Sequence, residues 1–237
     1  MVRPRAVPLA GRITVEDVNV RVAGILLAAG EGSRLGQPKA LVEVGGKTLA
    51  DRGAAMLASG GADPVLVVTG PVRVSVPGAW IVRNLDWRTG MGSSLAAGLH
   101  ALDLDSGPGD APTGPVPADG DWGEVGAAVI ALADQPLVGA DSVRRLIGAF
   151  TAGATVAAAA YDGQPRNPVL IAREHWAAVI ALAVGDTGAR PFLRAHPELV
   201  TLIECGDTGS PFDIDTPDDL ARISATFTER AVPGGAP

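Results

Sequence analysis

The sequence has few of the residues that build disulfides and zinc sites. Cys205 is its single cysteine, so no disulfide can form within the chain. Its three histidines, His100, His175 and His196, are scattered and lack the spacing of a zinc site. We therefore expect a protein of a reducing, cytoplasmic compartment, with no catalytic role for these histidines.

The chain is also poor in aromatic residues, in positive charge and in long apolar runs. Aromatic residues make up 4% of it and the formal net charge is −7, so neither aromatic stacking nor a broad basic surface for DNA or RNA is expected. Trp87 and Trp176 are expected to pack rather than to stack on a ligand. The most apolar stretches, 126–133 and 177–184, have about eight residues, against roughly 20 in a membrane span. Charged residues also interrupt the N-terminal stretch before any signal-peptide core. We expect no nucleic-acid or membrane partner. An anionic ligand would have to be bound by a few basic side chains at its own site, because the chain as a whole is negatively charged.

What is present is the composition of a globular α/β domain. With 237 residues, 47% of them hydrophobic, the chain is long enough for one such domain. We expect residues 20–228 to form it, after a flexible arm at 1–19 and before a flexible tail at 229–237. The segment 103–123 is crowded with Gly, Pro, Asp and Ala, and is predicted to be a flexible surface insertion.

Apolar runs and helical patterns alternate along this domain. Strands are predicted at 22–29, 64–69, 79–82, 126–133, 154–161 and 199–205, with 168–172 completing the core. Helices are predicted at 48–59, 93–102, 140–150, 174–184 and 189–196, and from Thr216 onward. Repeated βα units predict a three-layer, Rossmann-like α/β fold with a mostly parallel sheet and helices on both faces. Ligands of such sheets bind beyond the carboxyl ends of the strands, where Gly30 and Asp134 lie.

The last helix has a well-marked start. Thr216 can cap it, Pro217 suits the first helical position, and Asp219 completes a pattern like a capping box. Asp218 and Asp219 are therefore expected to be structural rather than catalytic.

The loop after the first predicted strand has the residues of a phosphate site. Between Leu27 and Lys39 it contains three glycines, Arg34 and the lysine itself. Glycines let the backbone approach a polyphosphate and present N–H groups to it, while the two basic side chains supply local positive charge. The loop is predicted to cradle phosphates.

Two familiar glycine motifs do not fit. The dinucleotide-binding motif needs its third glycine one residue earlier, and Asp51 falls inside a predicted helix rather than at a strand end. Residues 46–48 hint at a Walker A loop, but Leu41 stands where its first glycine belongs and no buried strand comes directly before it. A tight turn before a helix is the better interpretation of 46–48.

The loop from Leu27 to Lys39 resembles the signature L-A-A-G-x-G-x-R-x-G-x-x-K of nucleotidyltransferases with a MobA-like fold, a fold of the nucleotide-diphospho-sugar transferase type. Within this superfamily the chain is most similar to the molybdenum cofactor cytidylyltransferases, from about residue 22 to residue 223. Four further stretches support the resemblance: G-M-G-S-S-L at 90–95, D-Q-P at 134–136, G-D-T-G-A-R at 185–190 and D-I-D-T-P at 213–217. One such motif is weak evidence, whereas five in order are strong.

The resemblance implies attack by a terminal phosphate on the α-phosphate of a nucleoside triphosphate, with release of pyrophosphate. The residues agree, because the sequence has no nucleophile elbow or Cys/His pair and this reaction needs none. Catalysis then depends on positioning and on charge neutralisation by Mg²⁺, Lys39 and Arg34.

Two positions are candidates for the metal. Asp134 ends the most apolar strand, where an unpaired carboxylate is costly, so it is either exposed at the rim or holds a cation, which we favour. Asp213 and Asp215 face the same side of an extended segment, and either could add a second carboxylate. The resemblance favours Asp215. Magnesium binds through one or two carboxylates plus substrate phosphates, so we expect Mg²⁺ at Asp134 and Asp215.

The resemblance also implies which residues contact the nucleotide. They are Leu27, Ala28, Ala29, Gly30, Gly32, Ser33, Arg34, Lys39, Thr69, Gly92, Ser93, Ser94 and Asp134. The serine-containing loop at 90–95 is similar to that of the cytidylyl branch, whereas guanylyl relatives usually carry Leu-Ala-Gly-Gly at the first motif, so CTP is preferred to GTP. From the residues alone, Ser93 and Ser94 are simply N-cap candidates.

The implied acceptor is molybdopterin or its molybdate-loaded form, with a molybdoenzyme as candidate partner. Gln135, Asn167 and Arg190 are assigned to the acceptor side, although Arg190 can instead pair with a surface acid. The chain departs from the family here, because His is common where Asn167 stands and Glu43 replaces an expected proline.

Two alternatives stay open. A nucleotidyltransferase for a sugar phosphate or another small phosphate would share the loop and the metal. A nucleotide-binding chaperone that delivers a pterin cofactor would need no catalysis. Retention of Asp134 and Asp215 beside Lys39 favours an enzyme.

Overall fold

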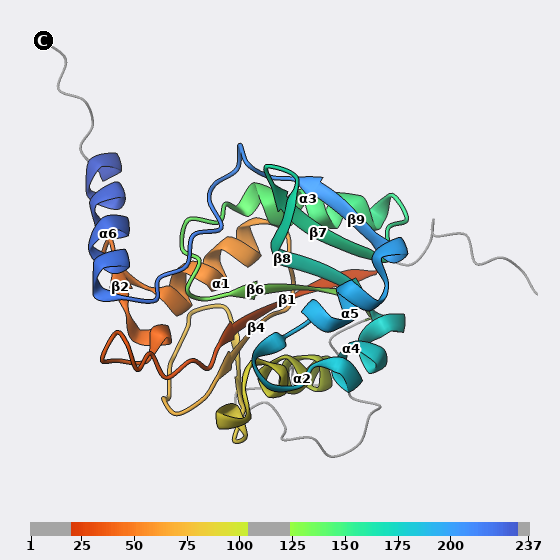
Figure 1. The fold of residues 1–237 in the computed structure, drawn as a ribbon, viewed down its shortest axis with the longest axis horizontal. Helices are drawn as coiled ribbons and strands as arrows, with labels where there is room; N and C mark the ends of the chain where they lie inside the picture. Colours follow the sequence, from red (N-terminus) through yellow and green to blue (C-terminus); the bar gives the residue numbers. More distant parts are fainter. Residues whose placement is uncertain (1–19, 104–123, 232–237) are drawn as a thin grey trace, which may run out of the picture.

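A central seven-stranded sheet organises the chain, which the computed structural model describes over residues 20–103 and 124–231 (Figure 1). The strands are β1 (Arg21–Ala28), β4 (Val65–Thr69), β5 (Trp80–Arg83), β6 (Val125–Leu132), β7 (Val156–Tyr161), β8 (Gln164–Ala172) and β9 (Val200–Glu204). Their order is β5-β4-β1-β6-β8-β7-β9. The predicted arm at 1–19, residues 104–123 of the predicted insertion and 232–237 of the predicted tail lie outside the described residues.

Parallel pairing dominates the sheet, as predicted. β1 pairs in parallel with β4 and β6, β4 with β5, and β7 with β9. β8 runs antiparallel to both of its neighbours and begins at Gln164 rather than at 168. The reason is a hairpin turn: Asp162 and Gly163 have φ of 52° and 71°, the left-handed conformation that a two-residue turn between β7 and β8 requires.

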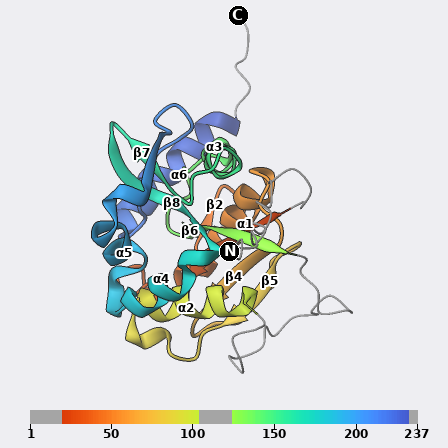
Figure 2. The same cartoon turned by 90° about the vertical axis from the view of Figure 1, so that its right-hand side faces the viewer.

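Helices cover both faces of the sheet (Figures 1 and 2). α1 (Leu49–Ser59) and α3 (Ala140–Thr151) cover one face, and α2 (Met91–Leu102), α4 (Trp176–Leu182) and α5 (Arg190–Ala195) cover the other. β1 is apolar on both sides, as buried parallel strands are: Val22 and Leu26 pack with the first group, Ala23 and Ile25 with the second. The predicted three-layer α/β fold is confirmed.

Residues 46–48 belong to a small hairpin, β2 (Glu43–Val44) and β3 (Lys47–Thr48), whose turn residues Gly45 and Gly46 have positive φ. The Thr48 side chain then caps α1 by accepting a hydrogen bond from the Asp51 backbone N–H at 3.0 Å. The tight turn before a helix is therefore confirmed, and the Walker A alternative is excluded.

Some helix limits differ from the predictions. α2 begins at Met91 rather than at 93, and a 3-10 turn over Arg173–His175 precedes α4 and shortens it. The last helix, α6 (Pro217–Ala231), continues past residue 228, where we expected the domain to end, and lies beside β2 (Figure 1). None of the described helices is long and apolar enough to cross a membrane.

Candidate functional site

The loop that follows β1 folds back on itself. The Leu35 backbone N–H donates to the Gly32 carbonyl at 2.9 Å, and that of Lys39 donates to Gly30 at 3.2 Å. Gly32 has φ of +65°, and a Cβ there would lie 1.9 Å from the Gln37 carbonyl oxygen, so the turn requires glycine. The loop thereby brings the Lys39 side chain back to the end of β1.

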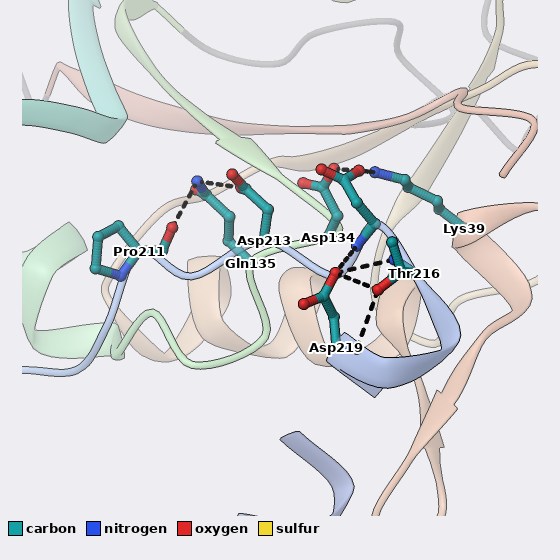
Figure 3. A network of polar contacts seen from close by, with 8 residues as sticks. Lys39, Asp134, Gln135, Pro211, Asp213, Thr216 and Asp219 are labelled. Carbon is teal, nitrogen blue, oxygen red and sulfur yellow. Dashed lines mark hydrogen bonds and ion pairs between the residues drawn. The ribbon is translucent and has the colours of Figure 1, made fainter. Parts of the chain in front are cut away.

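Lys39 meets two carboxylates at the carboxyl end of the sheet (Figure 3). Its Nζ lies 2.6 Å from Oδ2 of Asp134, which follows β6, and 2.6 Å from Oδ1 of Asp215, which precedes α6. The side chains of Lys39 and Asp134 are each 19% exposed, and that of Asp215 is 48% exposed. Partial burial lowers the pKa of Lys39, but the charges and hydrogen bonds of the two aspartates outweigh it and leave the pKa above its usual value.

The carboxylate pair fits a divalent cation. Oδ1 of Asp134 is buried and has no hydrogen-bond partner, a costly state for a carboxylate oxygen, whereas Oδ2 of the same group contacts Lys39. The described ranges contain no group of three or more His, Cys, Asp or Glu side chains that could hold a metal ion, so a cation here would have two protein carboxylates. Asp134 and Asp215 would thus supply two protein ligands, and substrate phosphates and water the others, as magnesium prefers.

Asp213 points to a different partner. Its Oδ1 accepts a hydrogen bond from Nε2 of Gln135 at 2.8 Å, and the same amide donates to the Pro211 carbonyl at 3.2 Å (Figure 3). Desolvation raises the pKa of Asp213, and the charges of Asp134 and Asp215 raise it further, against the effect of the Gln135 hydrogen bond. Of the two candidates for the second carboxylate, the structure brings Asp215 to Lys39.

A capping box fixes the backbone beside Asp215. The Asp219 N–H donates to Thr216 Oγ1 at 3.2 Å, and Asp219 Oδ2 accepts from the Thr216 N–H at 3.0 Å (Figure 3). The same oxygen accepts from the Asp215 N–H at 3.3 Å. The predicted structural role of Asp219 is confirmed, and it positions the carboxylate that contacts Lys39.

A cavity of about 570 Å³ adjoins the Lys39 cluster. The predicted nucleotide contacts that line it are Leu27, Ala28, Ala29, Gly30, Gly32, Ser33, Lys39, Ser94 and Asp134. The volume is within the range of about 300–1,000 Å³ that small-molecule sites have. The predicted phosphate loop, the lysine and the first metal ligand therefore face one space.

Four predicted contacts do not line this cavity: Arg34, Thr69, Gly92 and Ser93. Arg34 is exposed in the turn after the glycines. Thr69 ends β4 and is 1% exposed, with its carbonyl accepting from the backbone N–H of Asn84 at 2.8 Å. The structure thus leaves Lys39 as the basic side chain of the loop that faces the cavity.

The interpretation of Ser93 and Ser94 as N-caps is wrong. α2 begins two residues before Ser93, and the cap position is taken by Gly90, which has no side chain to accept a hydrogen bond. The Ser93 hydroxyl has one hydrogen to donate, and the Asp86 and Gly90 carbonyl oxygens both lie within reach, at 3.0 and 2.9 Å. Both serine hydroxyls accept hydrogen bonds from the Asn84 side-chain amide, at 2.8 and 3.0 Å. The serines therefore join the first turn of α2 to the loop before it.

Gly92 has a packing role. A Cβ on Gly92 would lie 2.1 Å from the Ala183 carbonyl oxygen, so the glycine allows α2 to approach the segment after α4. The approach lets Oδ1 of Asp186 accept a hydrogen bond from the Met91 N–H at 3.2 Å, at the first residue of α2. Asp186 also lines the cavity.

Sequence reasoning missed Asn84, Asp186 and part of the role of Trp87. The motif at 185–190 was the available signal for Asp186. The Asn84 side-chain oxygen has a local partner, the Asp86 N–H, but its amide nitrogen donates to serines of α2, which no local pattern predicts. Trp87 packs on Gly70, as expected, and also lines the cavity.

A second cavity, of about 660 Å³, lies next to the first and shares Leu27, Met91, Leu132 and Asp186 with it. The three predicted acceptor contacts, Gln135, Asn167 and Arg190, all line it. The structure therefore separates the predicted nucleotide side from the predicted acceptor side, and the four shared residues form the junction of the two cavities.

The histidines stay away from both cavities. His175 contacts Thr155 Oγ1 at 3.0 Å, and His196 lies 3.4 Å from Glu198. Trp176 is buried, and its Nε1 donates to the Ile171 carbonyl at 3.0 Å, so it packs as predicted.

The chain's similarity to known proteins agrees with this geometry. Residues 24–200 match the MobA-like NTP transferase domain. The chain belongs to this family. MobA-like NTP transferases are nucleotidyltransferases, so the predicted family and enzyme class are confirmed.

The relatives of this MobA-like chain are named for different activities. It is 35% identical over 216 residues to nicotine blue oxidoreductase of Paenarthrobacter nicotinovorans, covering 85% of this chain and 96% of the relative. It is 28% identical over 235 residues to molybdenum cofactor guanylyltransferase of Rhodobacter capsulatus, covering 90% of this chain and 100% of the relative. Among solved structures, a Mycobacterium sp. strain JC1 homologue of Mycobacterium tuberculosis Rv0371c superposes with a TM-score of 0.68 at 30% identity, covering 89% and 98% of the two chains.

Proposed function

We propose that this MobA-like transferase moves CMP from CTP to the terminal phosphate of molybdopterin, with Mg²⁺ at Asp134 and Asp215, and releases pyrophosphate. The single observation that carries the proposal is the contact of the Lys39 ammonium with both carboxylates, at 2.6 Å each, on the wall of the cavity that the glycine loop forms. The proposal includes a cytoplasmic location, which the lone, buried Cys205 supports, and a molybdoenzyme as recipient of the product.

The chemical step needs no covalent enzyme intermediate. An oxygen of the acceptor phosphate bonds to the α-phosphorus of CTP, the bond from that phosphorus to the oxygen bridging to the β-phosphate breaks, and pyrophosphate leaves with the bonding electrons. Lys39, held protonated, supplies positive charge to the phosphates, and Arg34 enters from the exposed side of the loop. When bound, Mg²⁺ would neutralise and align the triphosphate.

The preference for CTP rests on the resemblance of the serine-containing loop at 90–95 to that of the cytidylyl branch. Ser94 of this loop lines the first cavity together with Ala29. The guanylyltransferase relative makes GTP the competing nucleotide.

The test is pyrophosphate release with each of the four ribonucleoside triphosphates and Mg²⁺, with and without molybdopterin. We expect release with CTP and molybdopterin together. Release with GTP alone among the nucleotides would overturn the base preference. Release with sugar phosphates but not with molybdopterin would point to the sugar-phosphate alternative, and tight cofactor binding without any release would point to a chaperone.

A second candidate function follows from the relative that is named an oxidoreductase and shares 35% of its residues with this chain. In that function, one cavity would hold a hydride donor and the adjoining one an acceptor, which takes the hydride from the donor and a proton from solvent while the donor is oxidised. The Asp134→Asn variant separates the two functions. It should stop pyrophosphate release and leave hydride transfer unaffected, because hydride transfer needs no metal at Asp134.

A further inference from the structure

The wall of the second cavity combines an apolar part with a polar one. Side chains from the core strands, from α2 and from α5 face it: Leu27, Met91, Ile130, Leu132, Val169 and Leu193. On the edge strand β9, Leu202 lines the same space and is 48% exposed, a high value for a leucine. A cavity with such walls is suited to an apolar or conjugated ligand body.

Three arginines line this apolar space: Arg166 from β8, and Arg190 and Arg194 from α5. Arg190 and Arg194 are four residues apart on a helix, so their side chains share one face and repel each other. Arg166 donates to the neighbouring Pro165 carbonyl at 3.0 Å. Throughout 20–103 and 124–231, no ion pair joins any of the three to an acidic side chain.

The two acidic residues that line the cavity are engaged elsewhere. Asp186 accepts from the Met91 N–H at 3.2 Å, and Asp213 accepts from Gln135 at 2.8 Å. The three guanidinium groups are therefore available to a ligand. Their grouping is notable in a chain whose formal net charge is −7, because the surrounding field attracts cations rather than anions.

We propose that the second cavity binds an acceptor that carries a second anionic group on an apolar body, and that Arg166, Arg190 and Arg194 hold this group. Gln135, next to Asp134, lines the same cavity. The reacting phosphate of the acceptor can therefore lie where the two cavities join, while its second anionic group contacts the arginines. The inference rests on the proposed function for the statement that the ligand is the acceptor, and on the cavity alone for the ligand's chemistry. Planar guanidinium groups bind carboxylate and phosphate in the same bidentate way.

A pair of fluorescent dyes tests this chemistry without the reaction. Anilinonaphthalene sulfonate has an aromatic body with one anionic group, and phenylnaphthylamine has a similar body without the charge. In the Arg190→Gln, Arg194→Gln double variant, we expect the affinity for the sulfonate dye to fall about tenfold, as for lost hydrogen bonds to a charged group. The affinity for the neutral dye should change less than about twofold, because the apolar walls remain.

Two further variants locate the effect. Arg73→Gln makes the same kind of substitution, with the loss of one positive charge instead of two, at an exposed position outside both cavities and should leave both affinities unchanged. Leu202→Asp, at an exposed position on β9, should weaken binding of both dyes because it places a negative charge on the apolar wall. Unchanged sulfonate binding in the double variant, or an equal loss in Arg73→Gln, would overturn the proposal.

Competition identifies the anionic group. Displacement of the sulfonate dye by inorganic phosphate but not by succinate would support a phosphate as the second anionic group of the acceptor. Displacement by succinate but not by phosphate would support a carboxylate. Displacement by neither, at concentrations that leave the fold intact, would contradict an anion site. Failure of pyrophosphate release together with arginine-dependent dye binding would overturn the proposed function and keep this inference.

Discussion

Nζ of Lys39 lies 2.6 Å from Oδ2 of Asp134, a residue 95 positions later in the chain. The same ammonium lies 2.6 Å from Asp215, so it stands between the two carboxylates that would bind a metal. A metal at the proposed site would therefore compete with the lysine for the same two carboxylates until the phosphates of a bound nucleotide offer the ammonium another partner.

The Lys39→Met variant should bind Mn²⁺ more tightly in the absence of nucleotide. Removing the ammonium leaves two carboxylates without their countercharge, and a partly buried charge contact of this kind corresponds to about tenfold in affinity. Free Mn²⁺, measured by electron paramagnetic resonance during titration, checks this. The exposed Lys47→Met variant is the control, and an equal Mn²⁺ affinity in Lys39→Met and the unmodified protein would contradict the competition.

The Asp134→Asn variant should lose metal-dependent pyrophosphate release by about 100-fold or more, because a neutral amide cannot replace a carboxylate that binds the cation. Asn has nearly the same shape, so the circular dichroism spectrum should stay unchanged. Asp218→Asn, on the exposed first turn of α6, should keep full activity. Near-normal release by the Asp134 variant would refute the metal assignment.

The Gly92→Ala variant should destabilise the fold by about 1–3 kcal/mol, the cost of overpacking. The added Cβ would lie 2.1 Å from the Ala183 carbonyl oxygen and would push α2 away from the segment that carries Asp186. Gly148→Ala is the matched control, since a Cβ there meets nothing within 4 Å. This change should stabilise α3 by about 0.5–1 kcal/mol. Urea unfolding midpoints measure both changes in stability. If Gly92→Ala had the same midpoint as the unmodified protein, the close contact at Gly92 would be easily relieved.

Asp219 should make the stability of α6 depend on pH. Hydrogen bonds from the Thr216 side chain, and then from the Asp215 and Thr216 N–H groups, lower the pKa of Asp219 in the folded protein. A carboxyl group whose pKa is lower when folded stabilises the fold above its unfolded pKa of about 3.9, and loses this effect as the pH falls through the folded pKa. The Tm of Asp219→Ala should thus lie below that of the unmodified protein at neutral pH, and the gap should close toward about pH 3. A gap that is constant across this range would mean that the charge of Asp219 plays no part.

Local features of the chain were predictable from its residues. The capping box at Thr216 and Asp219, the turn before α1 and the glycine loop after β1 each depend on neighbours within a few positions. Their hydrogen bonds follow from residue type and spacing, and an apolar strand is visible in its own composition. The turn at Asp162 and Gly163 was equally local. The Asp-Gly pair between the predicted strands at 154–161 and 168–172 is a typical hairpin signal, but we did not predict a hairpin there.

Contacts between distant segments were decided by the tertiary structure. The choice of Asp215 over Asp213 depends on how the segment before α6 lies against the end of β6, where the Ile214 N–H donates to the Asp134 carbonyl at 2.8 Å. The roles of Asn84 and Asp186 depend on the close packing of α2 with the segment after α4.

The sequence by itself thus determined the fold class, the glycine-rich turn after β1 and the acidic residue types of the candidate site, because local hydrogen bonding and burial periodicity are encoded in adjacent residues. Only the tertiary structure decided which carboxylates meet Lys39 and which arginines share a cavity. Strand order sets those distances, and it brings Lys39 and Asp215, 176 positions apart, into contact.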